Sequence, residues 1–189
     1  MNRFRLAFPP SQIPRLAARY SKEQTDAARE EERRLVDRMG PAIRHQGHVQ
    51  EGQLRVLAIW KSPRILPRVR NNSASLVEET TRAAFSAQDE HLRIGTLMVL
   101  DGVGYPVASV ILHFGHRDSY PVLDFRALES LGVARSTSYT FEFWWAYVTA
   151  CRKLAAKHCD GDMRMLDRAL WQWSKTNQGD GVASGRRRS

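Results

Sequence analysis

The segment Gly102-Val103-Gly104 constrains the fold of this chain more than any other feature. It separates a segment over 90–100, which carries several apolar residues, from a segment over 106–114 that is apolar on nearly all sides. Pro106 suits the first turn of a helix, where its missing N–H costs no hydrogen bond. A helix that is apolar all round has to be buried. We therefore expect two helices joined by a tight glycine turn, with the second helix at the centre of the fold.

The rest of the sequence also predicts helices, and convincing strand alternation is scarce, so the expected fold class is all-α. Ser21 and Ser75 each begin a capping-box pattern, Asp89 and Asp162 are candidate N-caps, and Gly40-Pro41 is expected to end the first helix. The expected helices cover 22–39, 74–87, 90–100, 106–114, 125–131, 138–158 and 163–175. The short apolar segment over 53–61 could form another helix.

The domain organisation follows from proline, glycine and charge. Residues 1–20 contain Pro9, Pro10 and Pro14, which favour an extended N-terminal arm. Residues 21–175 are expected to form a single helical domain, with the hairpin near 90–114. Residues 176–189 are rich in Gly, Ser and Arg and predict a disordered basic tail. The run Arg186-Arg187-Arg188 would add only nonspecific electrostatic affinity for nucleic acid.

Composition limits the partners and the compartment. The 189 residues carry a formal net charge of +9, which fits nucleic acid or another anionic surface. Cys151 and Cys159 form no CxxC pair and indicate buried free thiols in a reducing cytoplasm. The sequence shows neither an eighteen-residue apolar run nor a signal peptide. We expect a cytoplasmic monomer without a membrane partner, associated with the nucleoid in a bacterium.

The glycine turn and a downstream acid are the candidate chemistry. Backbone N–H groups of Gly102, Val103 and Gly104, with the dipole of the following helix, would form a phosphate site, and glycine allows the phosphate to approach closely. Asp124 follows the apolar pair Val122-Leu123 and would begin the helix over 125–131. There an ionised carboxylate could stabilise positive charge at a sugar C1′ or orient an attacking water. Its plainer role is an N-cap, which is what most Asp residues before a helix are.

Residues 97–132 resemble the helix-hairpin-helix (HhH-GPD) DNA glycosylase superfamily, which includes endonuclease III and 8-oxoguanine glycosylases. The family pattern is Leu-Pro-Gly-Val-Gly, an apolar helix, and a Pro-Val-Asp style segment whose Asp is catalytic. This chain has Leu100-Asp101-Gly102-Val103-Gly104, the apolar residues over 107–112, and Pro121-Val122-Leu123-Asp124. The resemblance implies a divergent member with a glycosylase-like fold, double-stranded DNA as its partner, and Asp124 as the catalytic acid.

Three departures from the family pattern refine these expectations. Pro106 stands where bifunctional members carry the lysine that forms a Schiff base, so a monofunctional reaction is expected. Two cysteines exclude the four-cysteine iron–sulfur cluster of some members. Asp101 replaces the usual proline, and its carboxylate would repel a phosphate unless a cation, such as the monovalent ion that some relatives hold at the hairpin, offsets it.

Other basic residues are secondary candidates for DNA contact. Lys61 and Arg64 belong to a basic cluster with Arg68 and Arg70, followed by Asn71-Asn72, whose amides could bond phosphates or base edges. A solvated charged face is the plainer reading of this cluster. Arg126 could hold a phosphate near Asp124 or pair with Glu129 one turn on, and the ion pair is slightly favoured.

The candidates for a base pocket are aromatic and histidine side chains. Trp144 and Tyr147 follow the apolar stripe of the helix over 138–158 and predict core packing, whereas Trp145 lies off it and is the better candidate for stacking on a flipped base. His113 and His116 could line the cleft near Asp124. They lie three residues apart beside Asp118, but they need not share a face, so we expect no metal site.

Two hypotheses follow for function. The first is a base-excision-repair hydrolase, a monofunctional DNA N-glycosylase that flips a damaged or modified base and hydrolyses its glycosidic bond with Asp124. The alternative is a noncatalytic helix-hairpin-helix module for DNA binding or for interaction with other proteins.

Overall fold

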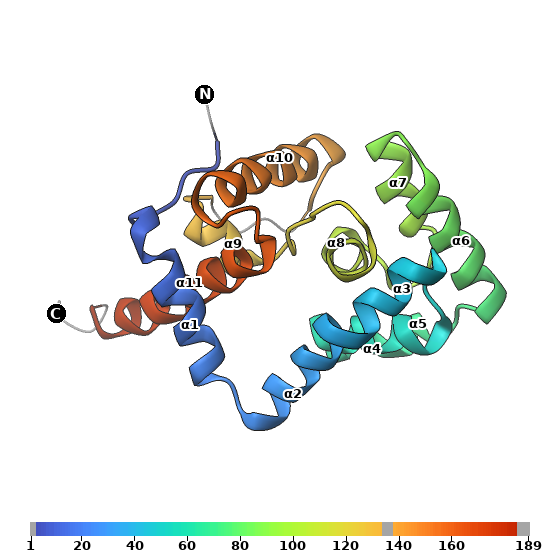
Figure 1. The fold of residues 1–189 in the computed structure, drawn as a ribbon, viewed down its shortest axis with the longest axis horizontal. Helices are drawn as coiled ribbons and strands as arrows, with labels where there is room; N and C mark the ends of the chain where they lie inside the picture. Colours follow the sequence, from blue (N-terminus) through green and yellow to red (C-terminus); the bar gives the residue numbers. More distant parts are fainter. Residues whose placement is uncertain (1–2, 134–137, 185–189) are drawn as a thin grey trace, which may run out of the picture. The chain divides into compact units, whose positions relative to one another are not determined.

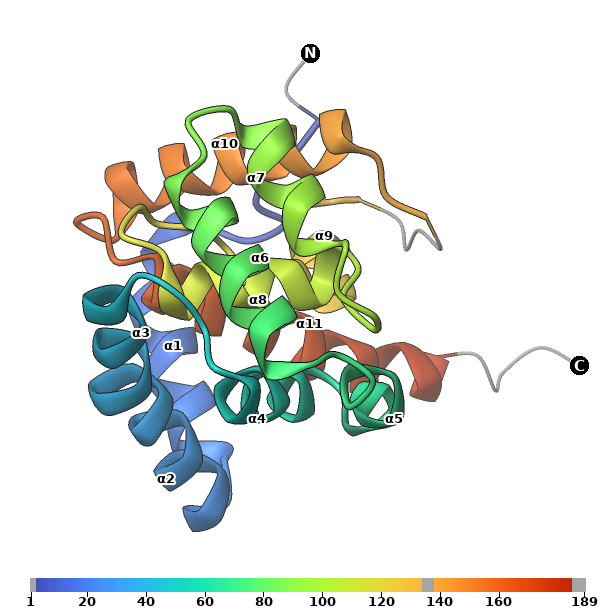
Figure 2. The ribbon, with the colours of Figure 1, turned by 90° about the vertical axis from the view of Figure 1, so that its right-hand side faces the viewer.

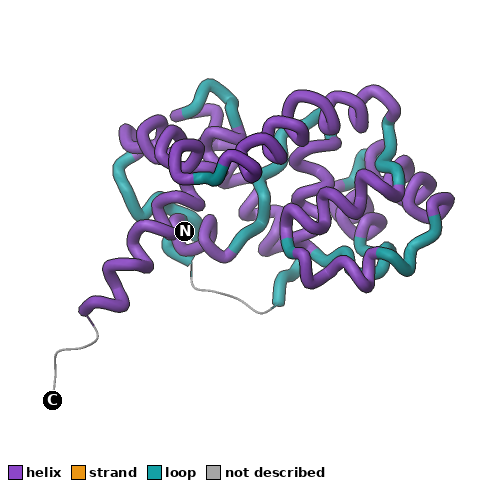
Figure 3. Tube along the Cα trace, turned by 90° about the horizontal axis from the view of Figure 1, so that it is seen from below, coloured by secondary structure: helices purple, strands orange, loops and turns teal. Residues whose placement is uncertain are grey.

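The structure, a computed structural model, describes residues 3–133 and 138–184. All the regular elements in these ranges are helical, as Figures 1 and 3 show, which confirms the all-α fold class. The chain divides into two compact units, and the expected single domain over 21–175 spans parts of both. We call residues 26–123 with 140–145 the hairpin unit. The described residues of 1–25, 124–139 and 146–189 are the terminal unit.

The hairpin unit is built around α8 (Tyr105–Gly115). Its elements precede α8 in the chain, except for the first residues of α10 (Phe141–His158), which continues in the terminal unit. The elements that precede α8 are α2 (Asp26–Arg34), η2 (Leu35–Met39), α3 (Gly40–Gln46), α4 (Glu51–Lys61), η3 (Pro63–Ile65), α5 (Leu66–Val69), α6 (Ala74–Ser86) and α7 (Glu90–Leu97). Figure 1 looks down the axis of α8, and Figure 2 shows α6 and α7 side by side.

The expectation that α8 is central is confirmed. Eight of its eleven residues are buried, including Val107, Val110, Ile111 and Phe114. Helices α3, α4 and α7 and the turn η2 pack against it. An apolar surface on all sides stabilises α8 only when neighbours cover every side, and these elements supply that cover.

The prediction of one helix over 22–39 that ends at Gly40-Pro41 was wrong. The chain instead forms α2, a π-helical turn η2 and α3, which begins at Gly40. Pro41 lies in the first turn of α3 and follows the wider π turn, so its missing N–H does not break the path of the chain. A Cβ at Gly40 would lie 2.8 Å from the carbonyl oxygen of Phe114. Glycine at position 40 therefore allows the chain to pack closely against α8 and does not mark the end of a helix.

The terminal unit combines both ends of the chain. It holds η1 (Pro10–Gln12), α1 (Ile13–Glu23), α9 (Phe125–Ser130), most of α10 and α11 (Met163–Ser184). Both α1 and α9 pack on α11. Near the N-terminus, the N–H groups of Arg5 and Ala7 donate to the carbonyls of Leu131 and Ser130 at 3.0 and 2.9 Å.

The expectation of an extended arm was wrong for residues 10–20. Pro10 and Pro14 each lie in the first turn of a helical element, where proline is tolerated. The buried residues Ile13, Leu16 and Ala17 form the face of α1 that covers α11. Ser21 does not cap a new helix, because its hydroxyl donates to the carbonyl of Ala17 within α1.

Several other helix ends follow the sequence closely. Asp89 caps α7 by accepting from the N–H of Leu92 at 2.8 Å, and Asp162 caps α11 by accepting from Met165 at 2.9 Å, as expected. Helix α6 is capped by Ser73 rather than within the Ser75 pattern, since Ser75 instead donates to Glu79.

The last helix runs beyond the expected start of the basic tail. Thr176 and Asn177 still bond the carbonyls of Gln172 and Trp173 four residues earlier, and α11 ends at Ser184. The arginine run over 186–188 lies outside the described residues.

Both cysteines are buried free thiols, as the sequence predicts. Burial raises the pKa of Cys159 to about 11 and that of Cys151 further still. In the described ranges, the structure has no helix of the length and apolarity needed to cross a membrane.

Candidate nucleic-acid interface and candidate acid

The turn between α7 and α8 is held by its own backbone and by α5. The N–H of Val103 donates to the carbonyl of Leu100 at 3.0 Å, and Gly102 has φ +82°, a conformation that favours glycine. A Cβ at Gly102 would lie 2.9 Å from Cγ2 of Val69 and 3.1 Å from its backbone N. Glycine is therefore required here by packing against α5, a reason that the sequence motif does not reveal.

Asp101 is hydrogen-bonded to α5 and to the residues that follow it. Its carboxylate accepts from Arg68 Nε at 2.9 Å and from Asn71 Nδ2 at 2.8 Å. The buried side chain of Asn72 bonds both the N–H and the carbonyl of Asp101, at 2.8 and 2.9 Å. The Asn71 amide, and then the Arg68 guanidinium, lower the pKa of Asp101.

This contact changes two expectations about the hairpin. The Arg68 guanidinium lies 2.8 Å from the Asp101 carboxylate. It therefore supplies the positive charge that a bound cation was expected to supply at the hairpin. The expectation that Asn72 faces a nucleic acid was wrong, because its amide is buried against Val69 and Asp101. Asn71 likewise donates to Asp101.

A groove of about 670 Å³ opens in front of the turn, and we call it the hairpin groove. Two basic side chains, Lys61 and Arg68, line it together with residues 98–104, Pro106 and Val107. Gly104 is exposed and is the N-cap of α8, which has no side-chain cap. A Cβ at Gly104 would meet only Cδ of Pro106, at 4.0 Å. The main chain at the start of α8 is thus open to the groove.

Of the basic residues predicted to contact DNA, some line the hairpin groove and others do not. Lys61 joins Gly102, Val103 and Gly104 at the hairpin groove, together with Arg68, which sequence reasoning kept only as part of a charge cluster. Arg64 is exposed on η3 but does not line this groove. The signal that could have found the Arg68–Asp101 pair is the acid itself, because a carboxylate next to an expected phosphate site needs a positively charged partner.

The segment that leads to Asp124 is anchored on α8. The hydroxyl of Ser109 accepts from the N–H of Leu123 at 2.8 Å and donates to the carbonyl of Pro106 at 2.8 Å. His113 Nδ1 donates to the carbonyl of Tyr120 at 2.6 Å. The Tyr120 hydroxyl donates to the carboxylate of Glu90 at 2.9 Å. Residues 120–123 are therefore fixed along α8, and Asp124 is the next residue of the chain.

Asp124 begins α9 and is half-buried. Its Oδ1 accepts from the N–H of Arg126 at 2.8 Å, so it has the N-cap role that the sequence allowed. Arg126 lies over the rings of Phe125 and Trp171, 5.1 and 5.2 Å from their centroids. Glu129, its expected ion-pair partner, accepts from the Ser174 hydroxyl at 2.6 Å. Arg126 is thus packed against aromatic rings on the terminal unit.

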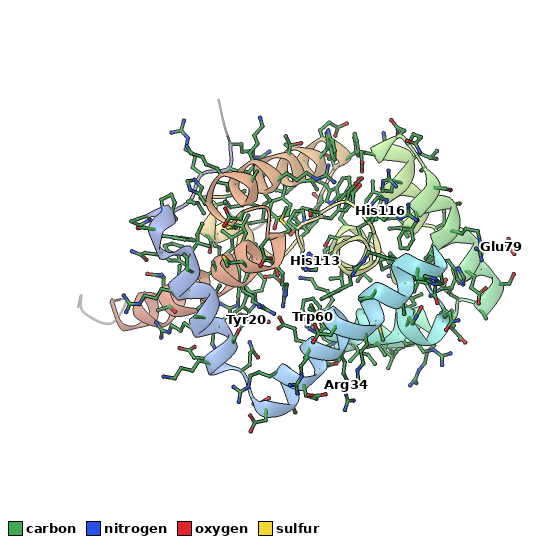
Figure 4. All side chains as sticks on the ribbon, in the orientation of Figure 1. Tyr20, Arg34, Trp60, Glu79, His113 and His116 are labelled. Atoms are coloured by element: carbon green, nitrogen blue, oxygen red, sulfur yellow. The ribbon has the colours of Figure 1, made fainter. Side chains whose placement is uncertain are left out.

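The base-pocket candidates do not form one group. Trp145 is half-buried, whereas the neighbouring Trp144 is fully buried, as the apolar stripe predicts. His113 contacts the segment before Asp124, but His116 contacts Arg93, with 2.8 Å between Nε2 and the guanidinium. Figure 4 shows the two histidines on different sides of α8. Among the described residues, no three His, Cys, Asp or Glu side chains gather as a metal site would require.

Comparisons with protein-family models, with curated proteins and with solved structures give no match to this chain.

Proposed function

We propose that this protein binds double-stranded DNA through its hairpin and acts as a monofunctional DNA N-glycosylase of the base-excision-repair type. The observation that best supports the proposal is the open main chain at Gly104, at the start of an eleven-residue helix and in a groove that Lys61 also lines. A helix N-terminus with exposed N–H groups attracts a phosphate, and a nearby lysine adds charge. The Arg68 guanidinium offsets the carboxylate of Asp101.

Asp124 is the proposed catalytic residue. A carboxylate has two oxygens and about four acceptor sites, so the N-cap bond from the Arg126 N–H and a role in catalysis are compatible. The carboxylate would stabilise positive charge at C1′ while the bond from C1′ to the base nitrogen breaks. It would also orient a water whose oxygen bonds to C1′, and the departing base takes up a proton. Pro106 offers no amine for a Schiff base, so the expected products are a free base and an intact abasic strand.

A noncatalytic DNA-binding module is the second candidate. It is favoured by the same bond from the Arg126 N–H, because an N-cap accounts for an acid at this position without any chemistry. In that case the hairpin groove alone would carry the function, and DNA binding would depend on Gly104 and Lys61 but not on Asp124.

A panel of duplexes, each with one damaged or modified base, separates the candidates. The glycosylase proposal predicts release of free base from at least one duplex. Salt-sensitive binding to duplexes without any base release would instead support the noncatalytic module. If no duplex is bound even at low salt, both proposals fail, and a helical protein-interaction domain remains.

A further inference from the structure

The hairpin unit contains a second hollow, at the opposite end of α8 from the glycine turn. It has a volume of about 480 Å³, and we call it the arginine hollow. Arg44, Arg82, Arg93 and Arg117 line it, together with Phe85 and His116. It shares no lining residue with the hairpin groove. The eleven residues of α8 separate the two sites by roughly 16 Å, given the rise of an α-helix.

Two of these arginines belong to the wall of the hollow. Arg44 donates to the carbonyl of Phe114 at 2.6 Å, near the C-terminal end of α8. Arg93 is buried, donates to the carbonyls of Ala84 and Phe85 at the end of α6, and pairs with Glu90. Carbonyls at a helix end carry partial negative charge, and these cations offset it. An anion in the hollow would therefore not be repelled by uncompensated carbonyl groups at the ends of α6 and α8.

The other two arginines are available to a ligand. Arg82 and Arg117 are exposed, and no described residue forms a hydrogen bond or ion pair with either guanidinium. One carboxylate, Asp118, is also at the hollow, with Oδ2 3.8 Å from His116 Nδ1. Burial, and then the charge of Arg93, lower the pKa of His116.

We propose that the arginine hollow binds a small phosphomonoester, such as a nucleoside 5′-monophosphate. A guanidinium fork matches phosphate oxygens in a bidentate way, and two such forks suit a dianion. The volume lies in the range of small-molecule sites and exceeds what one phosphate fills. The ring of Phe85, which packs edge-to-face with the His116 ring at 5.8 Å between centroids, offers an apolar surface to the group that the phosphate carries.

Calorimetric titration tests this proposal near neutral pH and at low salt. Inorganic phosphate, a nucleoside 5′-monophosphate and the matching unphosphorylated nucleoside are titrated separately. We expect the monophosphate to bind more tightly than phosphate alone, and the nucleoside to bind least. Tighter binding of the monophosphate would assign the apolar wall to the attached group, whereas binding of neither phosphate compound at millimolar concentration would overturn the proposal.

Matched double variants locate the site. Arg82→Gln with Arg117→Gln should weaken monophosphate binding at least about tenfold, because charge-assisted hydrogen bonds are lost. Replacing both residues by Lys should weaken binding less, since charge remains without the fork. The control, Arg15→Gln with Arg38→Gln, removes the same charge from exposed positions elsewhere. Unchanged binding in the Arg82/Arg117 pair, or an equal loss in the control, would contradict a site in this hollow. Matching circular dichroism spectra show that each variant is folded.

Discussion

Gly102 and Gly104 differ in how strictly the structure requires glycine, so their alanine variants provide a matched test of the packing at the hairpin. Gly102→Ala should destabilise the protein by about 1–3 kcal/mol, because the residue has φ +82° and its Cβ would approach Val69 to within 2.9 Å. Gly104→Ala should cost less than about 1 kcal/mol, because only the weaker N-cap preference of alanine opposes it. Urea unfolding of both variants measures the difference. Equal losses would contradict the packing assigned to Gly102.

Glu23 makes the stability of the terminal unit sensitive to acid. Hydrogen bonds from Arg19 and Gln172, joined by Lys175, lower the pKa of Glu23 from 4.5 to about 2. A carboxyl whose pKa is lower in the folded state stabilises the protein at any pH above the pKa that it has in the unfolded state. This contribution disappears as the pH falls from about 4.5 through 2. Stability should therefore fall in that window.

Two variants identify Glu23 as a source of this acid response. Unfolding midpoints of Glu23→Gln should depend less steeply on pH between 4.5 and 2 than those of the native protein. Arg19→Gln should flatten the dependence as well, because it removes the largest cause of the lowered pKa. An unchanged slope in Glu23→Gln would rule out this residue as the source.

At the scale of elements, Ser109 joins α8 to the segment before Asp124. Ser109→Ala should cost about 1–3 kcal/mol, because it leaves the buried N–H of Leu123 without its acceptor. The control is Ser86→Ala at an exposed position of α6, which should change stability little. Chemical unfolding measures both. A neutral Ser109→Ala would mean that the segment is held by other contacts.

Elements with strong local signals could be predicted from the sequence. Helix α8 follows from its apolar surface, and α7 and α11 from Asp89 and Asp162, since each signal lies within a few residues of the element. The missed elements depend on distant contacts. Pro10 and Pro14 suggest an extended chain until the face of α1 is seen against α11, and Gly40-Pro41 suggests a helix end until Gly40 is seen against α8.

At the scale of the whole molecule, the net charge of +9 means that the proposed DNA binding should weaken as the salt concentration rises. Lys61→Gln should weaken binding to all duplexes alike and should reduce the salt slope by about 1 if Lys61 contacts a phosphate. Fluorescence anisotropy over a salt series measures the slope. Arg15→Gln, which removes an exposed charge from α1, is the control. Equal slopes for the Lys61 variant and the native protein would remove this residue from the interface.

The candidate site could be predicted only in part. The glycine turn and Asp124 could be chosen as candidates from the sequence because the resemblance described above assigns a role to each position. The acid at position 101 indicates that a partner is needed, but the sequence does not identify Arg68 as that partner, because the contact joins residues 33 positions apart. The arginine hollow was missed for the same reason, since Arg44, Arg82, Arg93 and Arg117 come together only in the folded chain.

The most direct test of the central proposal is single-turnover release of free base from a lesion-bearing duplex, with Asp124→Asn beside the native protein. Asparagine is as good an N-cap as aspartate, so the variant should keep the stability and DNA affinity of the native protein. The proposal predicts base release by the native protein and a loss of at least about a hundredfold in the variant. Equal rates of base release by the two proteins would contradict the role of Asp124 as the catalytic acid.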